Sequence, residues 1–411
     1  MNDVRRSAPL ALALALFFTG VQFYTSLAAL SPTPPVGYVF LGGLGAMLLV
    51  VVLVLAALVA LVALLRDRAW IDATSRTILG AWIGSALLSS LLGLDPRSGL
   101  EVVGVMLLAA VFHVALRRYY ARPPVARLLL GLYLATGVAV TLAGLAMMAS
   151  HRPGALYAFN HGRAAGVFVT ANQFATYLLL MGFLAYGVAT IARDRALLAL
   201  AWTATALAAV ALVFSLSRAG WIGAVAGAIV LLLARGRRVA AVTAGAVLLA
   251  GLVALAALPV ARHDPADSLN RVAAAEAGLR AVLLFPLTGT GPMSYWRAYP
   301  SLRPPNGAEP GEFGALHPHD VYLSLAGETG LVGLAALLIG ALALTRGLRR
   351  ALRTGGADPR LPLAICAGLV ATLAQGLFDT VGIVQMTFVW IPYSALVLAA
   401  AESGAAAEEQ R

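Results

Sequence analysis

Apolar stretches of about 20 residues recur along nearly the whole chain and are separated by short polar turns. A helix of roughly 20 apolar residues is long enough to cross the hydrocarbon core of a bilayer. Hydrophobic residues make up 61% of the sequence and charged residues only 11%, which is too little polar material to cover a water-soluble globule. The pattern predicts an all-α, polytopic integral membrane protein with about 12 spans. The predicted spans are residues 8–29, 39–65, 77–93, 99–116, 128–149, 166–191, 196–214, 219–234, 239–260, 320–345, 361–378 and 384–400.

The distribution of arginine predicts the orientation of these spans. All 29 basic residues are arginines, so the sequence lacks the lysine that a phosphate-binding P-loop or a Schiff base requires. With the N-terminus in the cytoplasm, 20 arginines fall on the cytoplasmic side and 9 on the other. This bias follows the positive-inside rule and places both termini in the cytoplasm. The net charge of +11 therefore reports topology and does not indicate nucleic-acid binding.

The whole chain, 1–411, is predicted to form a single transmembrane domain with one long outer loop, residues 261–318, between the ninth and tenth spans. Inside this loop the sequence predicts a short helix that begins at Asp267 or Ser268 and ends near Pro286. Glu276 and Arg280 have the spacing of an ion pair on that helix. Its apolar residues share one face and could lie at the membrane surface; they are Leu269, Val272, Leu279 and Leu283.

Metal and disulfide scaffolds do not fit the sequence. Its single cysteine, Cys366, allows no intrachain disulfide, and no Cys/His cluster has zinc-ligand spacing. The chain also has no Asp-x-Asp pair, the usual carboxylate site for a metal-bound nucleotide sugar. We therefore expect chemistry that needs neither a metal ion nor a cofactor.

Three arginines on the outer side are candidates for anion binding. Arg218 lies in the tight turn between the seventh and eighth spans, and Arg163 lies just before the sixth, with Asn172 following in the helix. Arg271 lies in the long loop. A guanidinium presents a fixed fork of donors that suits phosphate oxygens, and a helix N-terminus adds to this preference. The alternatives are a snorkelling arginine for Arg218 and solvated loop or helix arginines for Arg163 and Arg271.

The most distinctive local pattern is His317-Pro318-His319-Asp320 at the entrance to the tenth span. A histidine held rigidly at this boundary could act as a general base, because its pKa lies near neutrality. His317 and Tyr322 are predicted to line the same substrate site. The alternative for His319 is a helix cap or an interface residue, and Asp320 could either orient it or complement the helix dipole. On a helix with 100° per residue, one stripe below His319 contains Tyr322, Ala326, Gly330 and Gly333. The small residues of this stripe predict close packing against another helix.

Three stretches resemble the O-antigen ligase and polymerase superfamily of membrane glycosyltransferases. The first is Arg163-Ala-Ala-Gly166 with Thr170-Ala-Asn-Gln173, and the second is Ser217-Arg-Ala-Gly220. The third runs from Arg271 through Phe285-Pro286 to His319, with Gly330 and Gly333 at the family's spacing after the histidine. Asp320 departs from the family's pattern, which has an amide or a hydroxyl at this position.

The resemblance implies a GT-C-like, metal-independent, inverting transfer of a glycan from undecaprenyl pyrophosphate at the periplasmic face of the bacterial inner membrane. In this reading His319 activates the acceptor hydroxyl, and Arg163, Arg218 and Arg271 hold the pyrophosphate. An O-antigen ligase would use a lipid A–core acceptor, and a polymerase would use a second lipid-linked glycan. A protein-glycosylating transferase is a third alternative. Transport of a lipid or glycan is a different class, for which His113 and Glu328 within predicted spans are the candidate residues.

Overall fold

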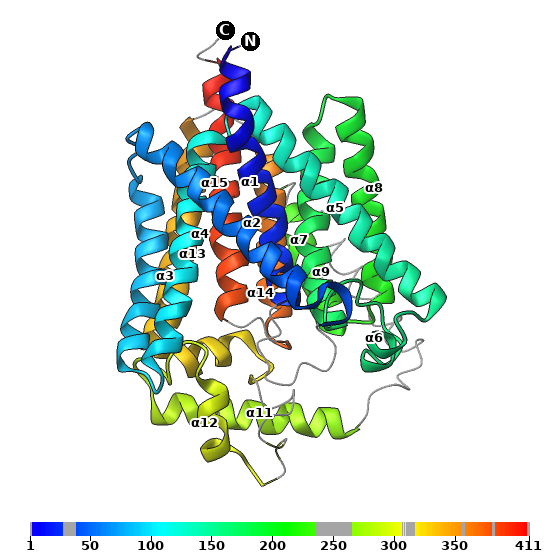
Figure 1. Ribbon diagram of the computed structural model, residues 1–411, viewed down its shortest axis with the longest axis vertical. Coiled ribbons are helices and arrows are strands. Elements are labelled where there is room, and N and C mark those ends of the chain that lie inside the picture. The colour runs from blue at the N-terminus through cyan, green and yellow to red at the C-terminus, as the bar shows by residue number, and fades with distance from the viewer. Residues whose placement is uncertain are drawn as a thin grey trace.

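The computed structural model describes residues 2–27, 38–234, 265–305, 307, 309, 317–354, 358–379 and 383–408, and over these ranges it contains helices and no strands (Figure 1). The predicted all-α fold is therefore confirmed. The helices are α1 (Asn2–Leu27), α2 (Tyr38–Arg66), α3 (Ala73–Leu92), α4 (Pro96–Tyr119), α5 (Pro123–Ser150), α6 (Gly154–Phe159), α7 (Ala171–Ile191), α8 (Arg195–Phe214), α9 (Arg218–Leu233), α11 (Pro265–Leu284), α12 (Tyr295–Leu302), α13 (Val321–Thr354), α14 (Arg360–Gln375) and α15 (Ile383–Glu408).

Every predicted span that falls on described residues coincides with a helix of the bundle. The predicted span 239–260 lies outside the described residues, so the number of 12 spans stays a prediction. Within the described residues, 7 helices are by length and hydropathy apolar enough to cross a membrane, and the chain is a multi-pass membrane protein. These 7 segments are Leu48–Arg66, Pro96–Tyr119, Pro123–Ser150, Ala171–Ile191, Arg195–Phe214, Val321–Thr354 and Met386–Ser403.

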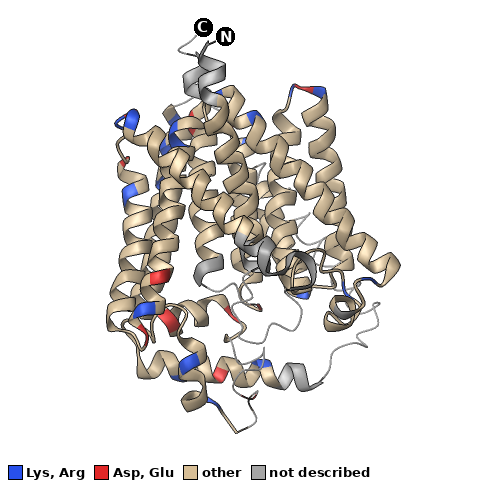
Figure 2. Cartoon of the chain, in the orientation of Figure 1, with Lys and Arg blue, Asp and Glu red and all other residues tan. Residues whose placement is uncertain are grey.

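The two ends of the bundle differ in what they carry. Both chain termini lie at one end, which we call the terminal end, whereas α6, α11 and α12 lie at the opposite, loop end (Figure 1). Charged residues gather at these two ends, and the helices between them are almost free of described charges (Figure 2). This distribution is what a bilayer requires, because a charge at its centre is costly.

Small residues bring the helices of the bundle close together. A Cβ atom added at Gly223 of α9 would lie 2.5 Å from the carbonyl oxygen of Ala371 in α14, and one at Gly227 would lie 2.7 Å from that of Ala367. Such short approaches allow close van der Waals packing where hydrophobic exclusion from water cannot act. Larger rings fill the space between α1, α5 and α15, where the hydroxyl groups of Tyr133 and Tyr393 lie 2.5 Å apart.

A polar cluster joins α3, α4 and α15 nearer the terminal end. The ring of His113 has Nδ1 2.9 Å from the carbonyl oxygen of Ile391 and Nε2 3.0 Å from the hydroxyl of Ser75. Arg117, one turn later, bridges Asp72 at 3.2 Å and Glu402 at 3.0 Å. Both ring nitrogens of His113 are therefore occupied by contacts between helices, which supports a structural role for this buried histidine.

Helix α13 is broken at Gly330, whose backbone has φ 66° and ψ −165°. The break frees backbone groups that the loop after α11 satisfies. Thr290 and Gly291 donate to the carbonyl oxygens of Gly327 and Glu328, at 2.8 and 2.9 Å. In the other direction, Leu331 and Val332 donate to the carbonyl oxygens of Pro286 and Leu287.

The predicted role of the small-residue stripe on this helix was therefore wrong. At Gly330 an added Cβ would lie 2.2 Å from the carbonyl oxygen of Leu287, and at Gly289 it would lie 2.3 Å from the backbone of Glu328. The missing side chains of Gly330 and Gly289 thus leave room for the loop to pack against α13, and not for a neighbouring helix. The helical angle of 100° per residue does not extend across the break, so Tyr322 and Gly333 do not form one continuous stripe with the residues between them.

Helix α11 begins at Pro265, so neither Asp267 nor Ser268 caps it as predicted. Proline is favoured in the first turn of a helix, where its missing N–H costs nothing. The predicted pair is confirmed, because Arg280 donates to Glu276 at 2.6 Å. Three of the predicted face residues are exposed, with Val272 at 67%, Leu279 at 50% and Leu283 at 71%. The side chain of Leu269 lies outside the described residues.

Candidate active site

Arg163 lies in the connection between α6 and α7, where it contacts two other segments. Its Nε donates to the carbonyl oxygen of Ser215 at 3.0 Å, and its Nη2 donates to Oδ1 of Asn172 at 2.6 Å. Asn172 belongs to the first turn of α7, which is capped by Thr170. Gly166 has φ +60°, which explains why glycine ends the Arg-x-x-Gly segment. The two contacts fix the plane of the Arg163 guanidinium at the loop end of the bundle.

Arg218 is the first residue of α9 and follows the turn that Arg163 contacts. The hydroxyl of Ser217 caps this helix by accepting from the N–H of Gly220 at 3.1 Å. An added Cβ at Gly220 would lie 2.9 Å from the Cβ of Ala175 in α7. The serine and glycine of this motif thus have structural roles, while the side chain of Arg218 is exposed. Arg163 and Arg218 therefore lie at the same turn. Arg163 binds the carbonyl oxygen of Ser215, and Arg218 follows Ser215 by three residues in the sequence.

The end of α14 connects this region to the start of α13. Gln375 donates from Nε2 to the carbonyl oxygen of Asn172 at 3.0 Å. The next residue, Gly376, accepts from the N–H of Val321 at 2.8 Å. Tyr322 donates its hydroxyl to the carbonyl oxygen of Leu373 at 2.9 Å, so this side chain anchors α13 on α14. Its predicted contact with substrate stays a prediction.

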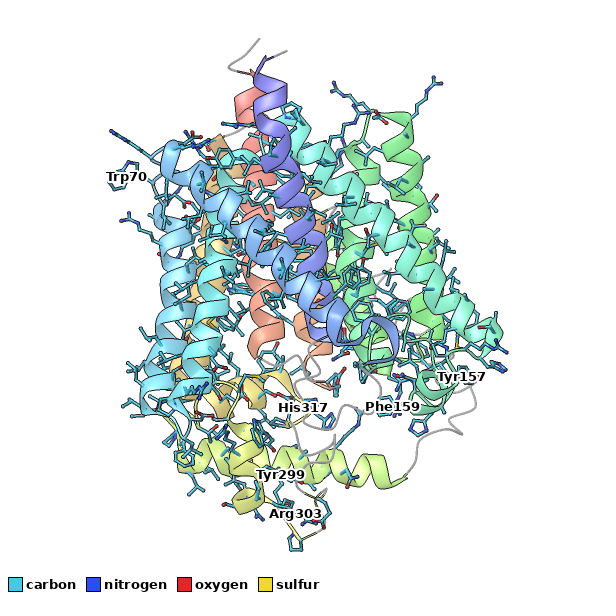
Figure 3. All side chains as sticks on the ribbon, viewed as in Figure 1. Trp70, Tyr157, Phe159, Tyr299, Arg303 and His317 are labelled. Carbon is cyan, nitrogen blue, oxygen red and sulfur yellow. The ribbon has the colours of Figure 1, made fainter. Side chains whose placement is uncertain are left out.

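His319 lies immediately before α13 in a left-handed backbone conformation, with φ +56°. Its ring packs edge-on against that of His317, with the ring centroids 4.5 Å apart. In Figure 3, His317 lies between the lower end of the bundle and α11. The next residue, Asp320, accepts from the N–H groups of Tyr322 and Leu323, both at 2.8 Å. Asp320 is thus a helix cap, a role that asparagine or serine at the same position could also fill.

Both histidines are held in their neutral form. Burial, with a smaller contribution from the positive charge of Arg271, lowers the pKa of His317 to about 4. Burial also lowers the pKa of His319 well below its ordinary value of 6.5, with smaller contributions from His317 and Arg271. Arg271, on α11, is therefore close enough to act electrostatically on both rings. A neutral imidazole in this position can accept a proton.

The contacts of Glu328 connect helices at the loop end of the bundle. Its carboxylate faces the backbone N–H groups of Met293 and Tyr295 at the start of α12, whose N-cap residue Ser294 makes no side-chain cap bond. The carbonyl oxygen of Glu328 also accepts from the hydroxyl of Ser89 at 2.8 Å. Glu328 therefore connects α12 and α3 to the break in α13.

One residue of this region was missed in the sequence. Gln375 lies within the predicted span 361–378, where it is the last polar residue of an apolar run. This position in the sequence could have marked Gln375 as a candidate. Its contact with Asn172, however, forms only in the folded chain, because the two residues are 203 positions apart in the sequence. Over the ranges that the structure describes, no three His, Cys, Asp or Glu side chains are grouped so that they could hold a metal ion.

Comparison with protein families shows that residues 203–338 match the O-antigen ligase family. No curated protein matches the chain. The matched residues include Arg218, Arg271 and His319, and Arg163 lies before them. They also include the break at Gly330 and the loop that fills it. The resemblance that the sequence motifs predicted is thus confirmed over these residues, and the chain is a multi-pass membrane protein that is similar there to the O-antigen ligase family.

Proposed function

We propose that the protein is an O-antigen ligase, which transfers a glycan from undecaprenyl pyrophosphate to a lipid A–core acceptor at the periplasmic face of the bacterial inner membrane. The observation that carries this proposal is the position of a neutral His319 within the electrostatic reach of Arg271. The contacts of α14 then connect the start of α13 to Asn172, the partner of Arg163. A proton acceptor and arginines at one end of an apolar bundle suit a hydroxyl acceptor and a lipid pyrophosphate.

The proposed reaction is a single displacement at the anomeric carbon of the donor sugar. The acceptor hydroxyl oxygen forms a bond to that carbon, the bond from the carbon to the pyrophosphate oxygen breaks, and the configuration inverts. His319 takes the proton of the hydroxyl. Arg163, Arg218 and Arg271 stabilise the charge that develops on the leaving pyrophosphate, which is the role that a divalent metal has in many other transferases. His317 and Tyr322 would line the acceptor side.

In vitro transfer with purified protein tests this function. The reaction contains an undecaprenyl-pyrophosphate glycan and excess EDTA, with lipid A–core or a second lipid-linked glycan supplied separately. We expect glycan on lipid A–core at the same rate with and without EDTA, because arginines replace the metal. A lengthened lipid-linked glycan would instead identify a polymerase. No product with either acceptor would contradict glycan transfer, and loss of activity in EDTA would contradict the metal-independent mechanism.

The pH dependence of transfer tests the role of the histidine. His319 loses its function as a base only when the pH falls through its own pKa, which lies well below 6.5. The value of kcat/KM is therefore expected to stay level from about pH 8 down to about pH 6.5 and to fall only in more acidic solution. A profile that is already half-maximal at pH 6.5 or above would show that no such depressed base limits the reaction.

A further inference from the structure

The orientation of the Gln375 side-chain amide is fixed by its partner. Gln375 is the last residue of α14 and is 1% exposed. The carbonyl oxygen of Asn172, 3.0 Å from the Gln375 amide, can only accept a hydrogen bond. The atom that faces it must therefore be Nε2, and the amide cannot be turned over without losing this bond. The remaining atom, Oε1, is an acceptor.

This acceptor is buried, and no described residue donates to it. The contrast with Thr372, one turn earlier on the same helix, is informative. The Thr372 hydroxyl is also buried, but it is satisfied by the carbonyl oxygen of Gly368 at 3.0 Å. Leaving a buried acceptor unsatisfied destabilises the fold, and native proteins therefore rarely keep such a group without a ligand or water that donates to it.

A second buried atom without a hydrogen-bond partner in the described ranges belongs to a residue just before α13. It is Nδ1 of His319, which precedes Val321, the residue whose N–H binds Gly376. The end of α14 thus joins the two parts of the proposed site: the Gln375 side chain binds Asn172, the partner of Arg163, and the adjoining Gly376 binds the start of α13.

We infer that Gln375 is a substrate-binding residue whose Oε1 accepts a hydrogen bond from a sugar hydroxyl. The inference rests on the proposed glycan transfer and names a contact that the sequence motifs do not contain. The chemistry selects a sugar over the pyrophosphate, because ionised phosphate oxygens are acceptors and would repel an amide oxygen. A hydroxyl of either the donor or the acceptor glycan could supply the proton, and the kinetics distinguish the two.

The test compares Gln375→Met with Thr372→Val. The first substitution removes the free acceptor at nearly constant volume, and the second removes a buried hydroxyl of the same helix that already has a partner. Steady-state transfer is measured while the donor and then the acceptor glycan is varied. Gln375→Met is expected to raise the KM of one glycan by about tenfold, with a much smaller change in kcat, because a ligand hydrogen bond is lost. Thr372→Val is expected to leave both KM values unchanged.

The glycan whose KM rises is the one that Gln375 binds. Unchanged KM values for both glycans, in a Gln375→Met protein with wild-type melting behaviour, would overturn the inference. If Gln375→Met does not fold, Gln375→Leu serves instead, since it also removes the acceptor. It is expected to raise the KM of the same glycan by about tenfold, and unchanged KM values in this folded variant would overturn the inference. Failure of the wild-type protein to transfer glycan would refute the proposed function itself, a separate outcome.

Discussion

Replacement of His319 by alanine is expected to lower kcat/KM for glycan transfer by about 10²- to 10⁴-fold, the range over which general-base catalysis contributes. The side chain lies before the first residue of α13 and carries no helix cap, because Asp320 supplies that cap. The melting temperature in detergent is therefore expected to change little. Transfer rates and thermal melts of His319→Ala and wild-type protein, measured side by side, give both quantities.

Asp320→Asn is the matched control for this substitution. An asparagine keeps the capping oxygen that accepts from Tyr322 and Leu323. Its activity is expected to stay within about threefold of wild type, because the cap and the position of His319 are kept. An active, folded His319→Ala protein would contradict the assignment of His319 as the base. A large loss of activity in Asp320→Asn would instead assign the chemistry to the neighbouring carboxylate.

Replacement of Gly330 by alanine is expected to prevent the accumulation of folded protein. The left-handed backbone at this residue costs about 1–3 kcal/mol for a residue with a side chain. In addition, the new Cβ would lie 2.2 Å from the carbonyl oxygen of Leu287, so the loop that satisfies the break in α13 would have to move. The yield of monodisperse protein in detergent and its melting temperature measure this effect.

Gly104→Ala in α4 is the matched control, because an added Cβ there meets nothing within 4 Å. Alanine is the better helix former, so this variant is expected to be as stable as wild type or more stable, by up to about 1 kcal/mol. A Gly330→Ala protein that folds and melts like wild type would show that the break does not depend on a glycine.

The helices could be predicted because hydropathy and helix length are properties of short segments. Their ends were less certain where apolar residues continue into a loop. The sixth predicted span starts at residue 166, for example, but Gly166 has φ +60° and α7 begins at Ala171. Residues such as Ala164 and Phe168 are buried in the loop, and their hydropathy does not distinguish them from residues of a helix.

The candidate site residues could be proposed from the sequence because their motifs contain residues with one dominant chemistry. Arginine and histidine at the ends of spans indicate anion binding and proton transfer on their own. Gln375 and the roles of Gly289 and Gly330 were not accessible in this way, because each depends on a backbone group distant in the sequence. The carbonyl oxygen of Asn172 and the loop at Leu287 reach these positions only in the folded chain.

An experimentally determined structure of the protein with a bound undecaprenyl-pyrophosphate glycan is the most direct measurement. The phosphate oxygens are expected about 3 Å from the guanidinium groups of Arg163, Arg218 and Arg271, with the anomeric carbon of the sugar facing His319. Pyrophosphate bound more than about 15 Å from His319, beyond the reach of a hydrogen-bonded acceptor, would contradict the proposed site. Binding at the terminal end of the bundle would contradict it equally.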